Sequence, residues 1–213
     1  MNTGVAPAYN LRAAVRHLKC SDARLSALIS GIGPCRLRLR GRLSPFEALL
    51  RAIIYQQLSG KAASTIFARF VALMPSEAGI APTQVLGLPE ALIRNAGLSR
   101  NKMLAVKDLA EKTLAGVVPG AGGLDDLTDD EIVARLTAVR GIGRWTVEML
   151  LIFTLGRPDV LPLDDLGVRK GYRLAYGMKA LPAASTLARA GKRWAPYRSV
   201  ASWYLWRAAD TTN

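Results

Sequence analysis

The sequence predicts an all-α protein built from two helical lobes with a cleft between them. Apolar residues recur at three- and four-residue spacing along most of the 213-residue chain, which is the pattern of amphipathic helices. Helix-capping signals precede several of these runs. The segment 117–127 is rich in glycine and contains Pro119, so it is the best candidate for a boundary between the lobes.

Residues 1–40 are expected to form an N-terminal helical segment that packs on a core domain of residues 41–213. Within this segment, Ser21 is a candidate cap for a short helix that ends at Gly31. Basic and apolar residues alternate in 36–43 (RLRLRGRL), which indicates a short strand or an extended arm.

The core domain opens with a capping box at 44–47 (SPFE), which has proline at the first helical position. The apolar residues of this helix fall on one face, and they are Phe46, Leu49, Leu50, Ile53 and Ile54. Residues 56–60 (QQLSG) interrupt the pattern, and the apolar spacing then predicts a second helix that reaches Met74.

Helical patterns continue through the rest of the chain. Thr83 to Asn95 fits two short helices, and a longer helix opens at Ser99 and ends near Gly116. Two further helices are expected near 183–190 and 196–209. The chain shows no convincing sheet, which supports the all-α assignment.

Two helices joined by a Gly-Ile-Gly turn form the first motif that suggests binding. A capping box at 128–131 (TDDE) opens a helix that is expected to stop near 139–140. Gly141 and Gly143 permit backbone angles that a Cβ would forbid, and a largely apolar helix begins near Arg144. Its unpaired N–H groups would let a phosphate approach closely. Taken alone, however, the turn favours a plain αα-hairpin.

An aspartate pair follows the hairpin. Residues 157–159 (RPD) break the helix, and the chain reads VLPLDD over 160–165 before a helical pattern resumes. One aspartate can be the N-cap of the new helix, and the next would lie in its first turn, where the helix dipole favours the ionised form. We expect Asp164 to be the N-cap and Asp165 to take part in a reaction. The alternative is that both aspartates cap the helix and neither takes part in chemistry.

The charge balance favours a polyanionic partner. The chain has 29 Lys and Arg against 16 Asp and Glu, a net charge of +13 and a pI near 10.3. A membrane surface would also attract such a chain, but no run of about 20 apolar residues predicts a spanning helix. The N-terminal segment MNTGVAPAYNLR lacks the apolar core of a signal peptide, so we expect a cytoplasmic protein.

Cysteine and histidine usage limits the metal chemistry. Cys20 and Cys35 are expected to be ordinary buried thiols, and two cysteines cannot provide a disulfide framework or a four-cysteine iron–sulfur cluster. His17 is the only histidine, which argues against a Ser-His-Asp triad or a histidine-rich metal site.

Four stretches carry a resemblance to a known family: GIGRWT at 141–146, LPLDD at 161–165, RWAPYRSVASWYLW at 193–206 and RAIIYQQLSGKAA at 51–63. Together they resemble the helix-hairpin-helix DNA glycosylase superfamily, most closely its 3-methyladenine DNA glycosylase II (AlkA-like) branch. The resemblance implies the helix-hairpin-helix DNA glycosylase fold, in which the hairpin and the aspartate border the cleft. It also implies that the catalytic carboxylate is Asp165.

The resemblance further implies how the hairpin meets DNA. Three positions match residues that contact phosphate: Gly141, Gly143 and Thr146. Three more match residues whose carbonyl oxygens often bind a monovalent cation, Na⁺ or K⁺: Thr137, Val139 and Ile142. Such a cation would strengthen the attraction for phosphate.

The resemblance also places a DNA-inserting loop and a base pocket. The loop residues Gln57, Leu58 and Ser59 would fill the gap left by a flipped nucleotide, although an ordinary loop with one leucine is nearly as good an explanation. Candidate pocket aromatics are Trp145, Tyr172, Trp203 and Trp206, of which Trp145 and Trp206 match the AlkA-like branch. Met149 stands where those relatives have a tyrosine. For each tryptophan taken singly, core packing is the competing explanation.

The implied chemistry needs only one carboxylate. Alkylation of a purine ring nitrogen gives the base a positive charge, so the base stacks well on an indole and is a good leaving group. Asp165 would stabilise an oxocarbenium-like sugar and orient or deprotonate water. Trp145 occupies the position where bifunctional relatives carry a nucleophilic lysine, which disfavours lyase chemistry through a Schiff base.

We therefore expect a monofunctional DNA glycosylase that flips alkylated bases, of the 3-methyladenine and 7-methylguanine type, out of duplex DNA and hydrolyses the N-glycosidic bond. It is expected to act as a monomer on damaged double-stranded DNA, with no required cofactor and no membrane association. The same fold acting on uracil or oxidised bases is one alternative. A non-catalytic helix-hairpin-helix DNA-binding module is another, and Asp165 argues against it.

Overall fold

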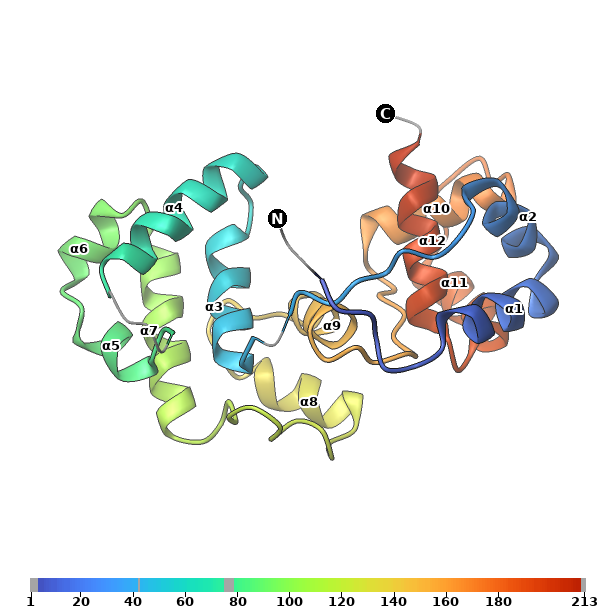
Figure 1. The fold of residues 1–213 in the computed structure, drawn as a ribbon. Helices are drawn as coiled ribbons and strands as arrows, with labels where there is room; N and C mark the ends of the chain where they lie inside the picture. Colours follow the sequence, from blue (N-terminus) through green and yellow to red (C-terminus); the bar gives the residue numbers. More distant parts are fainter. Residues whose placement is uncertain (1–3, 42, 75–78, 212–213) are drawn as a thin grey trace. The chain divides into compact units, whose positions relative to one another are not determined.

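The computed structural model describes residues 4–41, 43–74 and 79–211 (Figure 1). Within these residues, helices are the only regular structure apart from one isolated antiparallel bridge between Val5 and Leu39. The all-α prediction is therefore confirmed. No helix in the described part of the chain is long and apolar enough to cross a membrane.

The chain divides into two compact units. The first consists of residues 1–41 and 151–213, and the second of residues 42–150. The division falls after residue 41 and inside helix α9 (Arg144–Phe153), whereas the loop 117–127 lies within the second unit. Arg135 tethers the start of this loop, because its Nε donates to the carbonyl of Val117 at 2.7 Å.

The first unit brings together segments from both ends of the chain. Its helices are α1 (Leu11–Ser21), α2 (Ala23–Ile32), α10 (Leu166–Tyr176), α11 (Ala184–Gly191), the 3₁₀ helix η1 (Lys192–Trp194) and α12 (Arg198–Asp210). Helix α12 packs against α10, α2 and α1. In the segment predicted as a strand or arm, Leu39 N–H donates to Val5 O at 2.8 Å and Arg40 N–H donates to Phe153 O at 2.7 Å. The described part of this segment is thus an extended arm.

Asp22 is a buried carboxylate that joins four segments of the first unit. It caps α2 by accepting the amides of Arg24 and Leu25, at 3.0 and 3.1 Å. The prediction that Ser21 is this cap is therefore wrong, and Ser21 is the last residue of α1. Its Oδ2 also accepts hydrogen bonds from Tyr176 Oη at 2.5 Å and Trp194 Nε1 at 3.0 Å. A carboxylate can satisfy this many donors, which a serine hydroxyl cannot.

The charge on Asp22 is stabilised despite its burial. Burial by itself raises the pKa of this carboxyl, but the hydrogen bonds from Tyr176, Trp194 and Leu25 outweigh it. The nearby guanidinium of Arg193 acts in the same direction, so the pKa of Asp22 is lowered overall. An ionised buried group therefore lies where α1, α2, α10 and η1 meet.

The cysteines and the histidine lie in the same unit. Cys35 is partly buried, and this burial raises the pKa of its thiol to about 11. Cys20 is exposed, so the expectation of a buried thiol is wrong for this residue: the helical face that carries Leu18 is buried and the next positions point to solvent. The His17 ring packs edge-on against Tyr197, with centroids 5.5 Å apart.

The second unit contains the helices α3 (Pro45–Tyr55), α4 (Gly60–Ala72), α5 (Pro82–Gly87), α6 (Glu90–Asn95), α7 (Arg100–Leu114), α8 (Asp129–Leu136) and most of α9. The capping box predicted at Ser44 and Glu47 is present, and the apolar face of α3 is buried. Helix α7 packs against α3, α5 and α6, so it is central to this unit.

We predict that Asp22→Asn lowers the free energy of unfolding at neutral pH by about 2 kcal/mol, because a buried polar group left unsatisfied costs ~1–3 kcal/mol. Since the folded pKa is lowered, the contribution of Asp22 is fully present above the ordinary carboxyl range, near pH ~4, and is lost as the pH falls through the folded pKa. Urea denaturation at neutral and acid pH measures both effects. Asp130→Asn, at a side chain that is 91% exposed, is the control. Equal stability of the two variants would contradict this role for Asp22.

Candidate active site and nucleic-acid interface

The Gly-Ile-Gly turn lies in the second unit. Helix α8 begins with the predicted capping box, in which Glu131 N–H donates to Thr128 Oγ1 at 3.3 Å and Thr128 N–H donates to Glu131 Oε2 at 2.7 Å. The helix ends at Leu136, earlier than the predicted stop at 139–140, and the chain then tightens into turns. One of these turns is closed by Ile142 N–H on Val139 O, at 3.1 Å.

Of the two glycines of this turn, only Gly141 has a backbone conformation that favours glycine. Gly141 has φ +77°, a conformation that is unfavourable for a residue with a Cβ. A Cβ built on Gly143 would instead meet no heavy atom within 4 Å. Both glycines are exposed, whereas Ile142 and Thr146 are buried. The turn thus presents bare backbone ahead of the α9 N-terminus, an arrangement that suits a phosphate.

Helix α7 supports the turn through polar contacts that the sequence did not reveal. Asp108 Oδ2 accepts the amide of Arg140 at 2.6 Å, and Lys112 Nζ donates to Asp108 at 2.8 Å and to the Ala138 carbonyl at 2.6 Å. Burial alone would raise the pKa of Asp108, but these hydrogen bonds and charges lower it. In the sequence, Asp108 and Lys112 resemble an ordinary surface ion pair at i, i+4 spacing.

The predicted DNA-inserting loop connects α3 to α4 in the same unit. Gln57 and Leu58 are exposed, and Gln57 has φ +58°, which is strained for a residue with a side chain. Ser59 is also exposed, but its hydroxyl caps α4 by accepting the Ala62 amide at 3.4 Å. Gln56 Nε2 donates to the carbonyl of Gly141 at 3.0 Å and so ties the loop to the hairpin turn.

Asp165 lies at the N-terminus of α10 in the first unit. It is the N-cap of that helix, because its Oδ1 accepts the Val168 amide at 2.7 Å, while Asp164 is exposed. The predicted roles of the two aspartates as cap and first-turn residue are therefore wrong. Asp165 is 9% exposed, and its Oδ1 also accepts Trp206 Nε1 at 2.8 Å. The carboxylate is fixed in orientation and faces the positive end of a helix dipole.

Two glycines of α10 allow Asp165 and Trp206 to meet. A Cβ at Gly171 would lie 1.9 Å from the carbonyl oxygen of Leu205 in α12, and a Cβ at Gly167 would lie 2.7 Å from Trp206 Cδ1. Only a residue without a side chain permits these approaches. The close packing of α10 on α12 therefore sets the position of the Trp206 indole.

The side chains of Phe153 and Arg40 extend the packing around Trp206. The Trp206 ring is 5.5 Å from that of Phe153, with an interplanar angle of 31°, and the guanidinium of Arg40 lies 5.2 Å from the Phe153 centroid. Tyr172, also predicted for the base pocket, is instead 6% exposed in the core and stacks on Tyr176 at 4.0 Å. We therefore leave Tyr172 out of the pocket.

Of the remaining candidate pocket residues, Trp145 and Met149 belong to α9 and Trp203 belongs to α12. Trp145 lies in the first turn after Gly143 and is 48% exposed, which is unusual for so large an apolar side chain. Met149 follows one turn later and is partly buried. The exposure of Trp145 argues against a simple core role. Trp203 packs edge-on against Tyr204, with centroids 4.9 Å apart.

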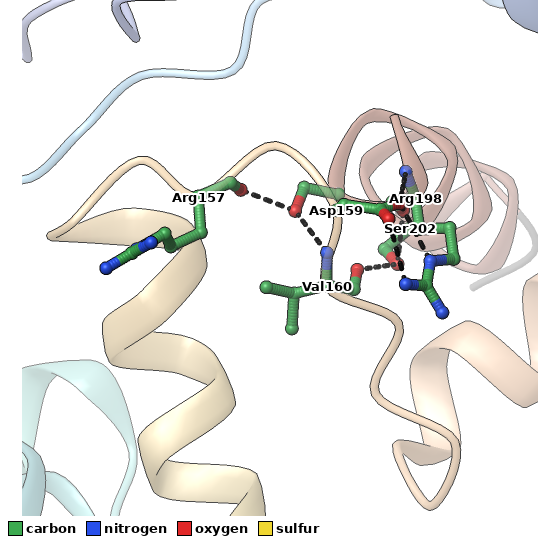
Figure 2. Close-up of polar contacts among 6 residues, drawn as sticks. Arg157, Asp159, Val160, Arg198 and Ser202 are labelled. Carbon is green, nitrogen blue, oxygen red and sulfur yellow. Dashed lines mark hydrogen bonds and ion pairs between the residues drawn. The ribbon is translucent and has the colours of Figure 1, made fainter. Parts of the chain in front are cut away.

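A polar network fixes the chain segment that leads to Asp165 (Figure 2). Asp159 forms a two-pronged ion pair with Arg198, with N–O distances of 2.7 and 2.8 Å. The buried Ser199 donates through Oγ to the Arg157 carbonyl at 2.7 Å and accepts the Val160 amide at 3.0 Å. Burial raises the pKa of Asp159, but Arg198 outweighs it and the pKa is lowered. These contacts join residues 39 and 42 positions apart, and no local pattern in the sequence predicts them.

Known proteins are similar to this chain in sequence and in fold. The family described as HhH-GPD superfamily base excision DNA repair protein matches residues 50–196. DNA-3-methyladenine glycosylase 1 of Schizosaccharomyces pombe is 37% identical over 92% of this chain and 87% of its own length.

Two solved structures are similar along most of their length. The 3-methyladenine DNA glycosylase of S. pombe, in complex with abasic DNA, has a TM-score of 0.82 and 36% identity over 92% of this chain and 95% of its own. A DNA-3-methyladenine glycosidase of Bacillus halodurans has a TM-score of 0.84 and 35% identity, and the match covers 93% of this chain and 90% of its own.

We predict that Gly171→Ala lowers the free energy of unfolding by about 3 kcal/mol or more, because overpacking costs ~1–3 kcal/mol and more when backbone must move. Gly31→Ala is the control, since its Cβ would meet no heavy atom within 4 Å. Thermal and urea denaturation compare the two variants. Similar stability of both would mean that α10 can move away from Leu205 without cost.

Proposed function

Because the chain belongs to the HhH-GPD superfamily of base excision DNA repair proteins, we propose that it is a monofunctional DNA glycosylase that excises alkylated bases of the 3-methyladenine type from duplex DNA. The observation that carries this proposal is Asp165, an oriented carboxylate whose Oδ1 is held by Trp206 and by the Val168 amide. The enzyme would act as a monomer, without an organic cofactor.

Asp165 would supply the negative charge that the reaction needs. As the N-glycosidic bond breaks, the bonding electrons leave with the base and positive charge develops on the sugar. A fixed carboxylate stabilises that charge without having to reorganise during the reaction, and it can also accept a proton from the attacking water. Trp206 would act on this step by orienting Asp165.

The leaving group explains why a single acidic residue is sufficient. An alkylated purine already carries positive charge, so its departure does not require protonation by a second acid. The exposed indole of Trp145 offers a surface on which such a base would stack. Trp145 also fills the position that a Schiff-base lysine occupies in bifunctional relatives, so we propose hydrolysis without strand cleavage.

The hairpin would anchor the enzyme on the DNA backbone. Gly141 and Gly143 leave room for a phosphate beside the α9 N-terminus. The backbone carbonyls of Thr137, Val139 and Ile142 would hold a monovalent cation, which would add positive charge next to that phosphate. The Val139 carbonyl also accepts the Ile142 amide, and a carbonyl has a second lone pair for a cation.

We predict that Asp165→Asn slows base release from methylated duplex DNA by at least ~10²-fold, because it removes the charge that stabilises the transition state. The asparagine oxygen can still accept from Trp206, so the fold and DNA binding are expected to persist. Asp164→Asn is the matched control, since that side chain is adjacent and exposed. Single-turnover assays should release free base and leave an intact abasic strand. Comparable rates for both variants would remove Asp165 from the catalytic role.

We predict that Gly143→Lys weakens DNA binding in spite of the added positive charge, because its side chain would occupy the space of the phosphate. Gly143 is a cleaner test than Gly141, because the positive φ at Gly141 would also strain the fold. Gly31→Lys adds the same charge at an exposed position on α2. Binding to undamaged duplex is measured as a function of salt concentration. Tighter binding by the Gly143 variant would contradict the anchoring role.

A further inference from the structure

The C-terminus of α3 is capped by a lysine from another helix. Lys102, in the first turn of α7, donates through Nζ to the carbonyls of Ile54 and Gln56, both at 2.7 Å. Ile54 lies in the last turn of α3, and Gln56 is its C-cap. These carbonyls form the negative end of the helix dipole, where an ammonium group is stabilising.

The carbonyl of Gln56 immediately precedes the strained residue of the inserting loop. Gln57 has φ +58°, and Leu58, which is 39% exposed, is held by its amide on Tyr55 O at 3.4 Å. On the far side, the Ser59 cap fixes the start of α4. Lys102 therefore holds the peptide from which the exposed tip of the loop projects. Strain of this kind persists only where the surroundings enforce it.

The residue Gln56 also links the loop to the hairpin. The backbone carbonyl of Gln56 accepts from Lys102, while its side-chain amide donates to the Gly141 carbonyl at 3.0 Å. Gln56 is thus held by α7 through its carbonyl and is bonded through its side chain to the turn that would bind phosphate. The distance between the loop tip and the hairpin is set through Gln56.

We propose that Lys102 is a positioning residue for base flipping. Lys102 holds the loop tip Gln57-Leu58 in the conformation that enters the DNA stack, and it keeps this tip at a fixed distance from the hairpin turn. This inference rests on the proposed glycosylase function. It assigns Lys102 to the insertion step, without contact with the reacting sugar.

The chain contains a matched control for this role. Lys107, on the same helix, donates through Nζ to the carbonyls of Leu86 and Leu88 at 2.6 and 2.7 Å. It caps the C-terminus of α5 just as Lys102 caps α3, and both lysines are partly buried. Helix α5 carries none of the proposed DNA-contacting residues. A comparison of variants at the two lysines therefore separates the effect of losing a helix cap from the effect of misplacing the inserting loop.

The test compares Lys102→Met with Lys107→Met, because methionine retains the aliphatic stem and removes the ammonium. Four quantities are measured: the single-turnover rate of base release from methylated duplex, the Kd for that duplex, the fluorescence of 2-aminopurine beside the lesion, and the Tm. Lys102→Met should slow base release by about tenfold or more, since a misplacement of ~1 Å can cost ~10²-fold. It should also reduce the fluorescence rise that reports flipping.

The control should separate these effects from loss of stability. Both variants should lower Tm by a similar amount, but Lys107→Met should keep the wild-type rate and fluorescence. The Kd should change little in either, because phosphate contacts dominate affinity. Lys102→Arg, which retains donors and charge, should recover most of the rate. Should Lys102→Met not fold, Lys102→Gln takes its place, with a donor left for one carbonyl.

Equal slowing by Lys102→Met and Lys107→Met, or an unchanged rate and fluorescence in Lys102→Met, would overturn the positioning role. A loss of rate explained by weaker binding alone would also overturn it. Failure of the wild-type enzyme to release any methylated base would count against the proposed function instead. In that case the fluorescence comparison on the same duplex still decides whether Lys102 controls flipping.

Discussion

Helix α10 approaches α12 so closely that a methyl group at Gly171 would lie 1.9 Å from the carbonyl oxygen of Leu205. This contact brings Trp206 against the N-terminus of α10, where its indole N–H meets the Asp165 carboxylate. The carboxylate is then held at once by a helix N-terminus and by a neighbouring helix. Its orientation is consequently a property of the packed first unit, and any change that separates α10 from α12 would break the hydrogen bond from Trp206 to Asp165 while leaving the one from the Val168 amide in place.

Two further carboxylates keep the rest of the first unit in place around that contact. Asp22 ties the junction of α1 and α2 to Tyr176 and Trp194, and Asp159 ties the segment before Asp165 to Arg198. Both are ionised, with lowered pKa values, because their donors outweigh the cost of burial. Of the two, Asp22 connects the N-terminal helices to residues 154 and 172 positions further along the chain, and apolar side chains from both ends of the chain pack in one core.

The second unit uses one helix for a comparable purpose. Along α7, Lys102 holds the loop between α3 and α4, while Asp108 and Lys112 hold the turn between α8 and α9. The loop contains a strained residue, because Gln57 carries a side chain at φ +58°, and the turn depends on a glycine at position 141, which adopts φ +77° without strain. A rigid helix that satisfies their backbone groups can keep the two segments preorganised. Binding to DNA would then not have to supply the cost of ordering them.

The sequence by itself determined the features that depend on neighbouring residues. The capping boxes at Ser44 and Thr128, the buried face of α3 and the glycine turn were all predicted correctly, because caps and apolar periodicity act within one or two helical turns. The same signals carried the all-α assignment. The aspartate pair was also located, since it follows a break in the helical pattern.

Only the tertiary structure decided which side chains meet. It made Asp165 rather than Asp164 the N-cap, made Asp22 rather than Ser21 the cap of α2, and moved Tyr172 into the core. In each case the outcome depends on partners far away in sequence, such as Trp206 for Asp165 and Trp194 for Asp22. A cap or an aromatic ring is compatible with several environments until the helices pack, and only burial with specific donors selects one of them.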